Sequence, residues 1–531
     1  MSTQTQTVLV PAHEHIPLET HHHPRPSLEF LDRPAQNASN PYSLLRKSAV
    51  ITQLAGVNLA ISAINGLVVV GLPSITADLH LSHSLSFWPV SVFSLATAST
   101  LLLAGSVADA LGPRAVDLIG CFASGAFMIG AGAARKGTDL VAIRAIQGVA
   151  FSLHLAASVA IVSQVFPRGR GRNFAFSCLG LSQPLGFSFG LVLGGVLEDT
   201  IGWRAGWFLY GGLTLLLSTI GLWALPKDKV IRTAGGILRQ LKDKIDIVGA
   251  LLASAFMAML SYLLAIISTD VYKIRDSESI VLLCLSAVAL PSFIAWVHRQ
   301  VRIGQPALIP NSLWKNSSFS TICATIALSF AVINSLELFA SLFFQQVQHL
   351  SALQASIRIL PSMVVGIILN FSMGLFVHRI PALWIVAISS AVCAVSPLLM
   401  ALIQPQWPYW SNAFVAQLLQ PVSTDALFTV GLLIITEVFP EDTQALAGAV
   451  FNTAAQLGSA LGVAVIQVVS TLITKENARL GESQALLEGF KASFWTMFGF
   501  MMLCGLLGVI GLRKTGRVGL KQELDDIKED G

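Results

Sequence analysis

The stretch VITQLAGVNLAISAINGLVVVGL, residues 50–72, carries no charged side chain and is long enough to cross a lipid bilayer as one helix. A helix needs about 20 mostly apolar residues to span roughly 30 Å of hydrocarbon. Similar runs recur along the chain and bring the predicted number of membrane-spanning helices to fourteen. A single run would be typical of an anchor, whereas fourteen favour a pathway for a solute.

The runs form groups of six, two and six, which predicts an all-α membrane protein of two six-helix halves with two additional central helices. The predicted spans are 50–72, 87–108, 115–134, 139–165, 173–197, 205–225, 245–268, 279–297, 317–343, 354–376, 383–403, 409–436, 444–472 and 490–512. The predicted domains are a disordered cytoplasmic N-tail (1–45), the N-terminal six-helix half (46–225), a basic cytoplasmic linker (226–244), the two additional helices (245–297), a cytoplasmic linker (298–316), the C-terminal six-helix half (317–512) and a cytoplasmic C-tail (513–531). For the basic linker, an amphipathic helix on the inner leaflet and a plain charged connection remain equally open.

Composition excludes several function classes. Hydrophobic residues make up 54% of the chain and charged residues 12%, against roughly 25% charged in an average soluble domain. The net charge of +4 is small, so nucleic-acid binding has no support. All six cysteines lie inside apolar runs and none pairs at metal-ligand spacing, which predicts neither a metal site nor a cofactor. No catalytic constellation and no phosphate-binding Gly-x-x-x-x-Gly-Lys-Ser/Thr motif occurs, so we do not expect an enzyme.

The distribution of Lys and Arg predicts the orientation in the membrane. With the N-terminus in the cytoplasm, the tails and the loops on that side carry 23 of the 33 Lys and Arg residues, and the opposite side carries eight. Cytoplasmic loops of membrane proteins carry an excess of these residues. Both termini are therefore predicted to be cytoplasmic, in a multi-pass protein of the plasma membrane.

The loop between the second and third spans contains the first motif, Gly105-Ser-Val-Ala-Asp109-Ala-Leu-Gly-Pro-Arg114. Gly105 permits close helix approach at the end of a span. Asp109 can accept hydrogen bonds from the start of a neighbouring helix, whose positive dipole end favours a carboxylate. Arg114 lies where the chain turns at the inner face of the membrane to begin the third span.

The fourth span contains the second motif, Arg144-Ala-Ile-Gln147-Gly148, whose three named residues share one helix face. An arginine within a span costs roughly 2.5–3.5 kcal/mol at the membrane centre on insertion scales, so it normally faces protein or water. The alternative is an arginine that extends its charge to the outer interface. We expect Arg144 to face the solute pathway.

Small residues recur at every fourth position of the fifth span, at Ser182, Gly186, Gly190 and Gly194. Such a stripe forms a groove for a partner helix.

These motifs resemble those of the major facilitator superfamily. The six-two-six count is similar to its fourteen-span drug:proton antiporter branch, in particular to fungal aminotriazole-resistance and boron-efflux type transporters. The stretches Ser423–Phe428 and Gln444–Thr453 add to this likeness, which covers residues 45–515. The resemblance implies two halves that rock around a site at the membrane midplane.

The chain departs from that branch at two positions. Many relatives carry an acid in the first span, where Ile64 stands here with Asn65 as the nearest polar residue. Leu191 occupies the place of the proline expected in the fifth-span antiporter motif. Protons therefore either use another carboxylate, or the coupling differs. In the second half, His378 occupies the place of Asp109 in a faint internal repeat.

Three ionisable residues within spans are candidates for proton coupling: Glu337 in the ninth, Asp425 in the twelfth and His154 in the fourth. Glu337 lies on a polar stripe with Asn334 and two further polar residues. Asp425 follows Pro421, which can hinge its helix. Acids within a membrane are functional candidates by default. The alternative for each of the three is a hydrogen-bonded group in a packed core.

Neutral amides and aromatic rings are candidates for the wall of a substrate cavity, and polar packing between helices is the alternative. The residues are Asn58, Asn65, Asn334, Phe344, Phe428, Asn452 and Gln456. Amides among apolar walls suit an amphipathic organic solute better than a highly charged one.

The sequence thus predicts a secondary transporter, a monomer in the lipid bilayer, that exports small amphipathic organic compounds such as a drug or a fungal secondary metabolite in exchange for protons. One alternative is an uptake carrier or facilitator for a nutrient or an inorganic solute, which the missing first-span acid favours. The other is a membrane sensor without transport, against which the short tails argue.

Overall fold

The computed structural model describes residues 42–81, 87–166, 170–227, 246–269, 271–305, 307–309, 311, 313–439 and 441–517. The regular elements in this part are all helices, without a strand, apart from an isolated bridge between Pro381 and Arg517. Fourteen helical segments in this part are long and apolar enough to cross a membrane. The prediction of an all-α membrane protein is confirmed.

The first group of six helices comprises α1 (Leu44–Asp78), α2 (Trp88–Leu111), α3 (Pro113–Gly132), α4 (Gly137–Val165), α5 (Arg170–Thr200) and α6 (Arg204–Ala224). The additional pair is α8 (Ile247–Thr269) and α9 (Ser277–Arg302). The last group comprises α10 (Ser317–Leu342), α11 (Ala352–Phe376), α12 (Ala382–Ala401), α13 (Ala413–Leu419), α14 (Val422–Val438), α15 (Glu441–Glu476) and α16 (Glu482–Gly511). Helices α13 and α14 together form one span.

Local sequence sets several of the helix starts. The Ser43 hydroxyl accepts a hydrogen bond from the backbone N–H of Arg46, and Asn316 caps α10 in the same way. Ser351 and Gln354 form a reciprocal capping box at the start of α11. Gly112 has a φ of 100°, which suits glycine, and Pro113 then opens α3 at the first helical position.

Most predicted spans match the observed helices within a few residues, with two differences in length. Helix α1 extends six residues beyond the predicted span at each end, and α16 begins at Glu482 rather than at residue 490. An apolar window ends where polar residues begin, whereas helical hydrogen bonding continues past the membrane surface. The predicted span 409–436 is broken at Gln420 and Pro421, between α13 and α14.

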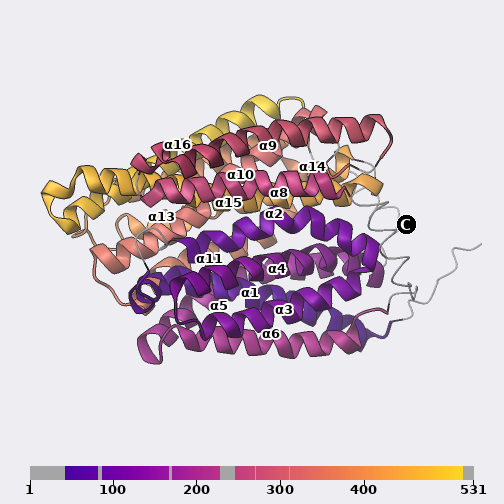
Figure 1. The fold of residues 1–531 in the computed structure, drawn as a ribbon, viewed down its shortest axis with the longest axis horizontal. Coiled ribbons are helices and arrows are strands. Elements are labelled where there is room, and N and C mark those ends of the chain that lie inside the picture. Colours follow the sequence, from indigo (N-terminus) through magenta and orange to yellow (C-terminus); the bar gives the residue numbers. More distant parts are fainter. Residues whose placement is uncertain are drawn as a thin grey trace, which may run out of the picture. The chain divides into compact units, whose positions relative to one another are not determined.

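The helices pack as two sets whose pairings correspond (Figure 1). In the first set α1 packs on α5 and α6, and α3 packs on α4 and α6. In the second set α10 packs on α15 and α16, and α12 packs on α14 and α16. Across the two sets, α2 packs on α15 and α5 packs on α11. The repeat that was faint in sequence is therefore clear in the helix contacts.

Glycines spaced four residues apart form the tightest seam in each set. A Cβ atom on Gly190 would lie 1.9 Å from the backbone oxygen of Ala63, and α5 meets α1 there. The corresponding seam joins α15 to α10, where a Cβ on Gly458 would lie 2.1 Å from the oxygen of Ala327. Both seams allow backbones to approach more closely than any larger residue would permit.

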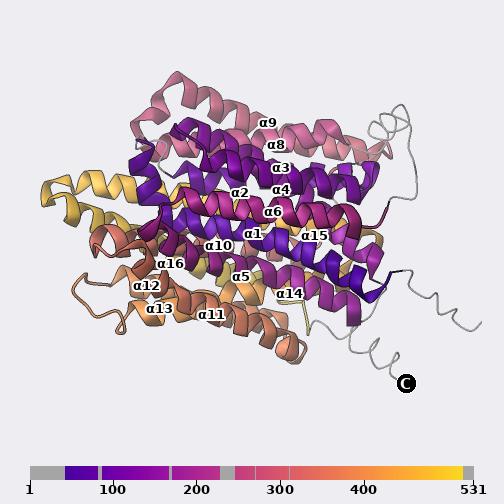
Figure 2. The ribbon, with the colours of Figure 1, turned by 90° about the horizontal axis from the view of Figure 1, so that it is seen from below.

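The additional helices α8 and α9 pack on each other, and Figure 2 shows them side by side at one margin. Helix α8 also packs on α2 and α15, one helix from each set. Buried Asp246 precedes α8 and accepts hydrogen bonds from the indole of Trp296 at 2.7 Å and from the backbone N–H of Leu308 at 3.2 Å. This carboxylate therefore fastens the pair to the segment that leads into α10.

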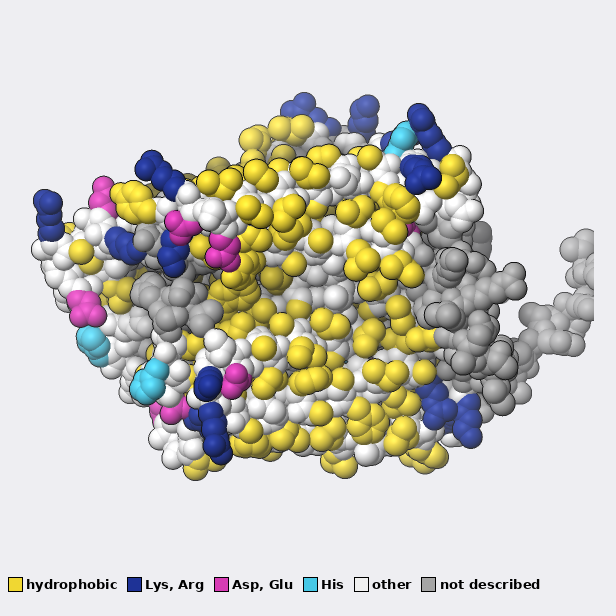
Figure 3. Space-filling model, in the orientation of Figure 1, with side chains coloured by type: hydrophobic (Ala, Val, Ile, Leu, Met, Phe, Trp, Pro, Cys, Tyr) yellow, Lys and Arg dark blue, Asp and Glu magenta, His cyan; other side chains and the backbone are white. Residues whose placement is uncertain are grey.

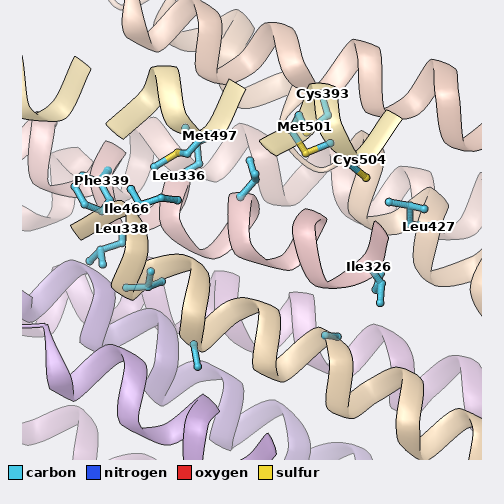
Figure 4. Packing of buried hydrophobic residues seen from close by; sticks show 14 of the residues in the cluster. Ile326, Leu336, Leu338, Phe339, Cys393, Leu427, Ile466, Met497, Met501 and Cys504 are labelled. Carbon is cyan, nitrogen blue, oxygen red and sulfur yellow. The ribbon is translucent and has the colours of Figure 1, made fainter. Parts of the chain in front are cut away.

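Apolar side chains fill the interior and also cover the outside. Figure 4 shows part of the larger core cluster, in which Phe339 of α10 and Met497 and Met501 of α16 are wholly or almost wholly buried. Figure 3 shows one face covered largely by hydrophobic side chains, with charged side chains toward its two ends. A face of this kind suits contact with lipid hydrocarbon, where soluble proteins would carry charge.

Candidate functional site

A central cavity of about 230 Å³ lies between the two helix sets. Helices α1, α2, α4 and α5 line it from one set, and α10, α11, α14 and α15 line it from the other. Its polar and charged lining residues are Ser62, Asn65, Ser91, Ser94, Arg144, Gln183, Asn334, Glu337, Ser362, Asn370, Thr424, Asp425, Gln456 and Ser459. The rest of the wall is mostly apolar, so the cavity suits a solute with both polar and apolar parts.

Arg144 is the cation of the cavity wall, and its side chain is fully buried. Its guanidinium donates hydrogen bonds to the Asn65 carboxamide oxygen at 2.8 Å, to Gln147 at 3.1 Å and to the backbone oxygen of Pro89 at 3.2 Å. The motif on α4 therefore holds α1 and α2 together through one side chain. The planar guanidinium of arginine can donate to several acceptors in different directions at once, whereas the ammonium group of lysine is a compact point charge.

Aromatic rings supply the remaining environment of this guanidinium. Its central carbon lies 4.6 Å from the centroid of the Phe93 ring and 5.5 Å from that of Trp207. None of the described carboxylates lies within ion-pair distance of Arg144. The positive charge is thus held by neutral acceptors and π-faces, and it remains uncompensated beside the cavity.

The two acids of the cavity come from the other helix set. Glu337 of α10 is only 6% exposed. Asp425 lies in the first turn of α14, and one of its carboxylate oxygens accepts a hydrogen bond of 3.0 Å from the Asn370 side chain on α11. A Cβ on Gly366 would lie 3.2 Å from the other oxygen, so α11 approaches this carboxylate closely. The opposite charge, on Arg144, is thus supplied by the first set.

The helix break at Pro421 sets the position of Asp425. Proline has no N–H and clashes with the preceding turn, so the chain ends α13 and begins α14 around it. The backbone oxygen of Gln420 accepts a hydrogen bond of 3.1 Å from the thiol of Cys393 on α12. A new helix start beside the cavity places Asp425 in a first turn, where the helix dipole favours its carboxylate.

Several residues predicted for the cavity wall lie there, namely Asn65, Asn334, Phe428 and Gln456. Three others lie elsewhere. Asn58 donates to the Leu179 backbone oxygen and the Ser182 hydroxyl, and so joins α1 to α5. Phe344 is buried against Tyr409, and Asn452 donates to the oxygen of Gly448 in its own helix. The polar-packing alternative describes Asn58 well, because amides suit both uses equally.

His154, predicted as a proton-coupling candidate, does not line the cavity. Its ring nitrogen Nδ1 lies 2.8 Å from a carboxylate oxygen of Asp117 on α3, and both side chains are buried. Helix α4 therefore carries Arg144 toward the cavity and His154 toward α3. The two residues are ten positions apart on the helix, a spacing that points their side chains in different directions.

The glycine and loop motifs act mainly in packing. A Cβ on Gly148 would meet the backbone of α2 at Phe93, and a Cβ on Gly186 would meet Leu59 at 2.2 Å. Gly194 approaches the backbone of Leu67 more loosely. The close helix approach predicted at Gly105 is wrong, because nothing lies within 4 Å of a Cβ on that residue. Arg114 donates to the backbone oxygen of Leu222 and so joins the start of α3 to the end of α6.

The predicted roles of several other residues fall outside what the structure describes. The side chains of Asp109 and His378 belong to this group, as does the linker from residue 228 to residue 245. The same holds for the N-tail up to residue 41 and for the C-tail from residue 518.

Sequence reasoning missed Asn370 in the cavity and Asp117 outside it. Asp117 had a signal, because it is an acid inside an apolar run with Cys121 four residues later. Asn370 had none beyond its polarity, because its pairing with Asp425 requires the contact between α11 and α14.

Hydrogen bonds between the two helix sets gather at one end of the bundle. We call it the outer end; there α1 and α5 finish and α11 begins, and the charge pattern predicts that it faces away from the cytoplasm. Gln345, just after α10, donates to the backbone oxygen of Val70 at 2.9 Å, and Ser341 donates to that of Val69 at 3.4 Å. The two halves therefore meet at the outer end.

The family model of the Major Facilitator Superfamily matches residues 54–416. The chain belongs to the major facilitator superfamily. It is a secondary transporter of the membrane, and not an enzyme.

Individual similarities agree with this assignment. The "MFS-type transporter 1" of Pyricularia oryzae is 36% identical over 524 residues, covering 90% of this chain and 85% of the relative. The puromycin resistance protein of Streptomyces alboniger is 30% identical, covering 76% and 77%. A solved bacterial homologue of the human lysosomal transporter Spinster, in an inward-facing and unoccupied conformation, superposes with a TM-score of 0.62 at 13% identity, covering 89% and 98%.

Proposed function

We propose that this transporter exports small amphipathic organic compounds in exchange for protons, as a monomer in the fungal plasma membrane with both termini cytoplasmic. The observation that carries the proposal is the central cavity, which Glu337 and Asp425 of one half and Arg144 of the other line together with polar and apolar side chains. A resistance protein among the relatives supports export of toxic organics. The six-two-six layout supports the fourteen-span drug:proton antiporter branch.

Coupling would work through the cost of burying charge. An ionised carboxylate in a closed apolar cavity is far less stable than the protonated form, so closure of the cavity favours the protonated acid. An open cavity exposes Glu337 and Asp425 to water, where release of the proton is easier. Substrate and proton would then alternate in one cavity while the two halves rock about it.

Arg144 would hold helices α1, α2 and α4 of the N-terminal half in fixed positions relative to one another during this cycle. Its three hydrogen bonds tie α1, α2 and α4 together, so the cavity wall of this half would move as one body.

The test is transport by the purified protein in proteoliposomes with an imposed proton gradient. Labelled puromycin and a panel of other toxic amphipathic organics serve as probes. We expect movement against the substrate gradient only when protons run the opposite way, and its loss with a protonophore. Glu337→Gln and Asp425→Asn should each reduce gradient-driven accumulation at least tenfold. Full accumulation by both variants would overturn their assignment as proton carriers.

A second candidate function is an uptake carrier or facilitator, which the absence of a carboxylate at Ile64 favours. The same vesicles separate the two. Movement of solute in the direction of the proton gradient, or movement that ignores the gradient, would support this second function and contradict export.

A further inference from the structure

Four buried polar side chains gather inside the first helix set, outside the central cavity. They are Gln53 of α1, Asp117 and Cys121 of α3, and His154 of α4. His154 is 1% exposed and the other three are fully buried. The transport cycle proposed above uses none of them.

Distances within the group are short. Nδ1 of His154 lies 2.8 Å from one Asp117 oxygen and 3.2 Å from the Cys121 sulfur. That sulfur lies 3.6 Å from the other Asp117 oxygen. The Gln53 amide nitrogen donates to Asp117 at 3.0 Å and to the Cys121 sulfur at 3.5 Å. Three different donor elements, oxygen, sulfur and nitrogen, therefore converge on one point.

We propose that Asp117, Cys121 and His154 form a binding site for one transition-metal dication such as Zn²⁺ or Co²⁺. Thiolate, imidazole and carboxylate together are the ligands that zinc takes in proteins. Bond lengths of about 2.0–2.3 Å in a tetrahedral site separate neighbouring ligand atoms by about 3.3–3.6 Å. The Cys121 sulfur lies 3.2 Å from Nδ1 of His154 and 3.6 Å from one Asp117 oxygen, close to this geometry. The 2.8 Å between Nδ1 and the other Asp117 oxygen would have to lengthen by about 0.5 Å when a metal enters.

The charges of the ligands suit a dication. A carboxylate, a thiolate and a neutral imidazole together carry two negative charges, which one dication neutralises. A buried site that is neutral when loaded avoids the cost of an uncompensated charge.

Gln53 can complete the site. Its Oε1 is buried without a hydrogen-bond partner, while its amide nitrogen faces Asp117 and Cys121. The two ends of an amide have nearly the same shape, and a half-turn about the last side-chain bond directs the oxygen at the metal. The fourth ligand would then be a neutral oxygen, which leaves the charge balance unchanged.

The site lies near the end of the bundle at which α3 begins, because Asp117 is one turn from Pro113. This end is predicted to face the cytoplasm, from which the ion would come. Once bound, the ion would join α3 to α4 through three bonds, and Gln53 would add α1 through a fourth. The N-terminal half would then be stiffer, while the central cavity would keep its own residues.

The test is a Co²⁺ titration of the full chain, purified with a tag free of histidine and treated with a chelator beforehand. We expect one equivalent of Co²⁺ bound through a thiolate, seen as a sulfur-to-cobalt charge-transfer band, and displaced by Zn²⁺. Any Co²⁺ taken up by His21, His22 and His23 of the N-tail would give no such band, because imidazole side chains contain no sulfur. The band, and not total metal, is therefore the measurement.

Cys121→Ser should abolish the band, and the matched control Cys323→Ser, a buried cysteine of the other half, should keep it. Asp117→Asn and His154→Gln should each weaken binding at least tenfold while the monomer peak in size-exclusion chromatography stays unchanged. Absence of the band in the unmodified protein, or an equal band in Cys121→Ser, would show a hydrogen-bonded polar core without metal and overturn the proposal. Neither result depends on transport.

Discussion

The carboxamide oxygen of Asn65 on α1 accepts a hydrogen bond of 2.8 Å from the buried guanidinium of Arg144 on α4. Asn65 is the nearest polar residue to the place where relatives of the resembled branch carry an acid. A neutral amide therefore stands where an ion pair with Arg144 would be easy to form. The described hydrogen-bond partners of the guanidinium are therefore all neutral oxygens.

The first prediction concerns the shape of the Arg144 side chain. Arg144→Lys keeps the charge but cannot divide its donors among Asn65, Gln147 and Pro89, so gradient-driven transport should fall at least about tenfold. Transport in proteoliposomes, normalised to the amount of folded protein, measures this. If the lysine variant transports at the full rate, charge alone is sufficient and the positioning role is wrong.

The second prediction concerns the hydrogen bond from Asn370 to Asp425. Asn370→Leu removes a donor that stabilises the ionised carboxylate, so a higher pH is needed to empty the acid of its proton. The pH at which transport is half-maximal should therefore move upward, while the maximal rate changes less. Asn452→Leu, in which the lost amide bonded only its own helix, serves as the control. A downward shift, or equal shifts in both variants, contradicts the assignment.

The third prediction concerns the seam between α1 and α5. Gly190→Ala places a Cβ atom against the backbone of Ala63, and overpacking of this kind costs roughly 1–3 kcal/mol of stability. Gly180→Ala lies on the same helix with nothing within 4 Å of the new atom, so it should be neutral or slightly stabilising. Thermal unfolding in detergent compares the two. Equal melting temperatures for the two variants would mean that α1 and α5 can move apart to accommodate the new Cβ atom without loss of stability.

The fourth prediction concerns the contacts at the outer end. Gln345→Leu removes the donor to Val70, so the outer end should open more often. A Ser62→Cys probe in the cavity should then react several-fold faster with a membrane-impermeant maleimide added outside. Gln404→Leu, an exposed position beyond α12, is the matched control. An unchanged labelling rate would show that this contact does not hold the outer end closed.

The fifth prediction concerns Tyr409, which lies outside the spans and donates a hydrogen bond of 2.8 Å to the backbone oxygen of Arg358. Burial raises the pKa of Tyr409 to about 12, above its ordinary value of 10. The folded state therefore favours the protonated phenol, and this stabilisation is complete below pH 10 and is lost as the pH rises toward 12.

Tyr409→Phe should accordingly lower stability by about 1 kcal/mol, equally at pH 6 and pH 8. The difference from the unmodified protein should shrink only above pH 10. Denaturation curves at several pH values test this, and a difference that varies between pH 6 and pH 8 would assign the effect to another group.

The fourteen-span helical fold could be predicted from the sequence, because the length and the apolar composition of a segment are enough to identify a membrane span. It also identified Arg144, Glu337 and Asp425, since a charge within an apolar run is conspicuous. It could not separate Asn58 from Asn65: both are amides on the first span, yet one packs against α5 and the other holds Arg144. The rotation of α1 about its own axis determines which of the two amides faces the cavity. Because α1 is apolar on almost every side, its sequence does not indicate that rotation.

The contacts at the outer end have a consequence for genetics. Ser341 and Gln345 bind the main-chain oxygens of Val69 and Val70, and every residue type carries that oxygen. No exchange of side chains at positions 69 and 70 can delete the acceptors. A selection for variants that loosen this end should therefore recover donor-losing changes at Ser341 and Gln345, while their partners on α1 tolerate any replacement that fits.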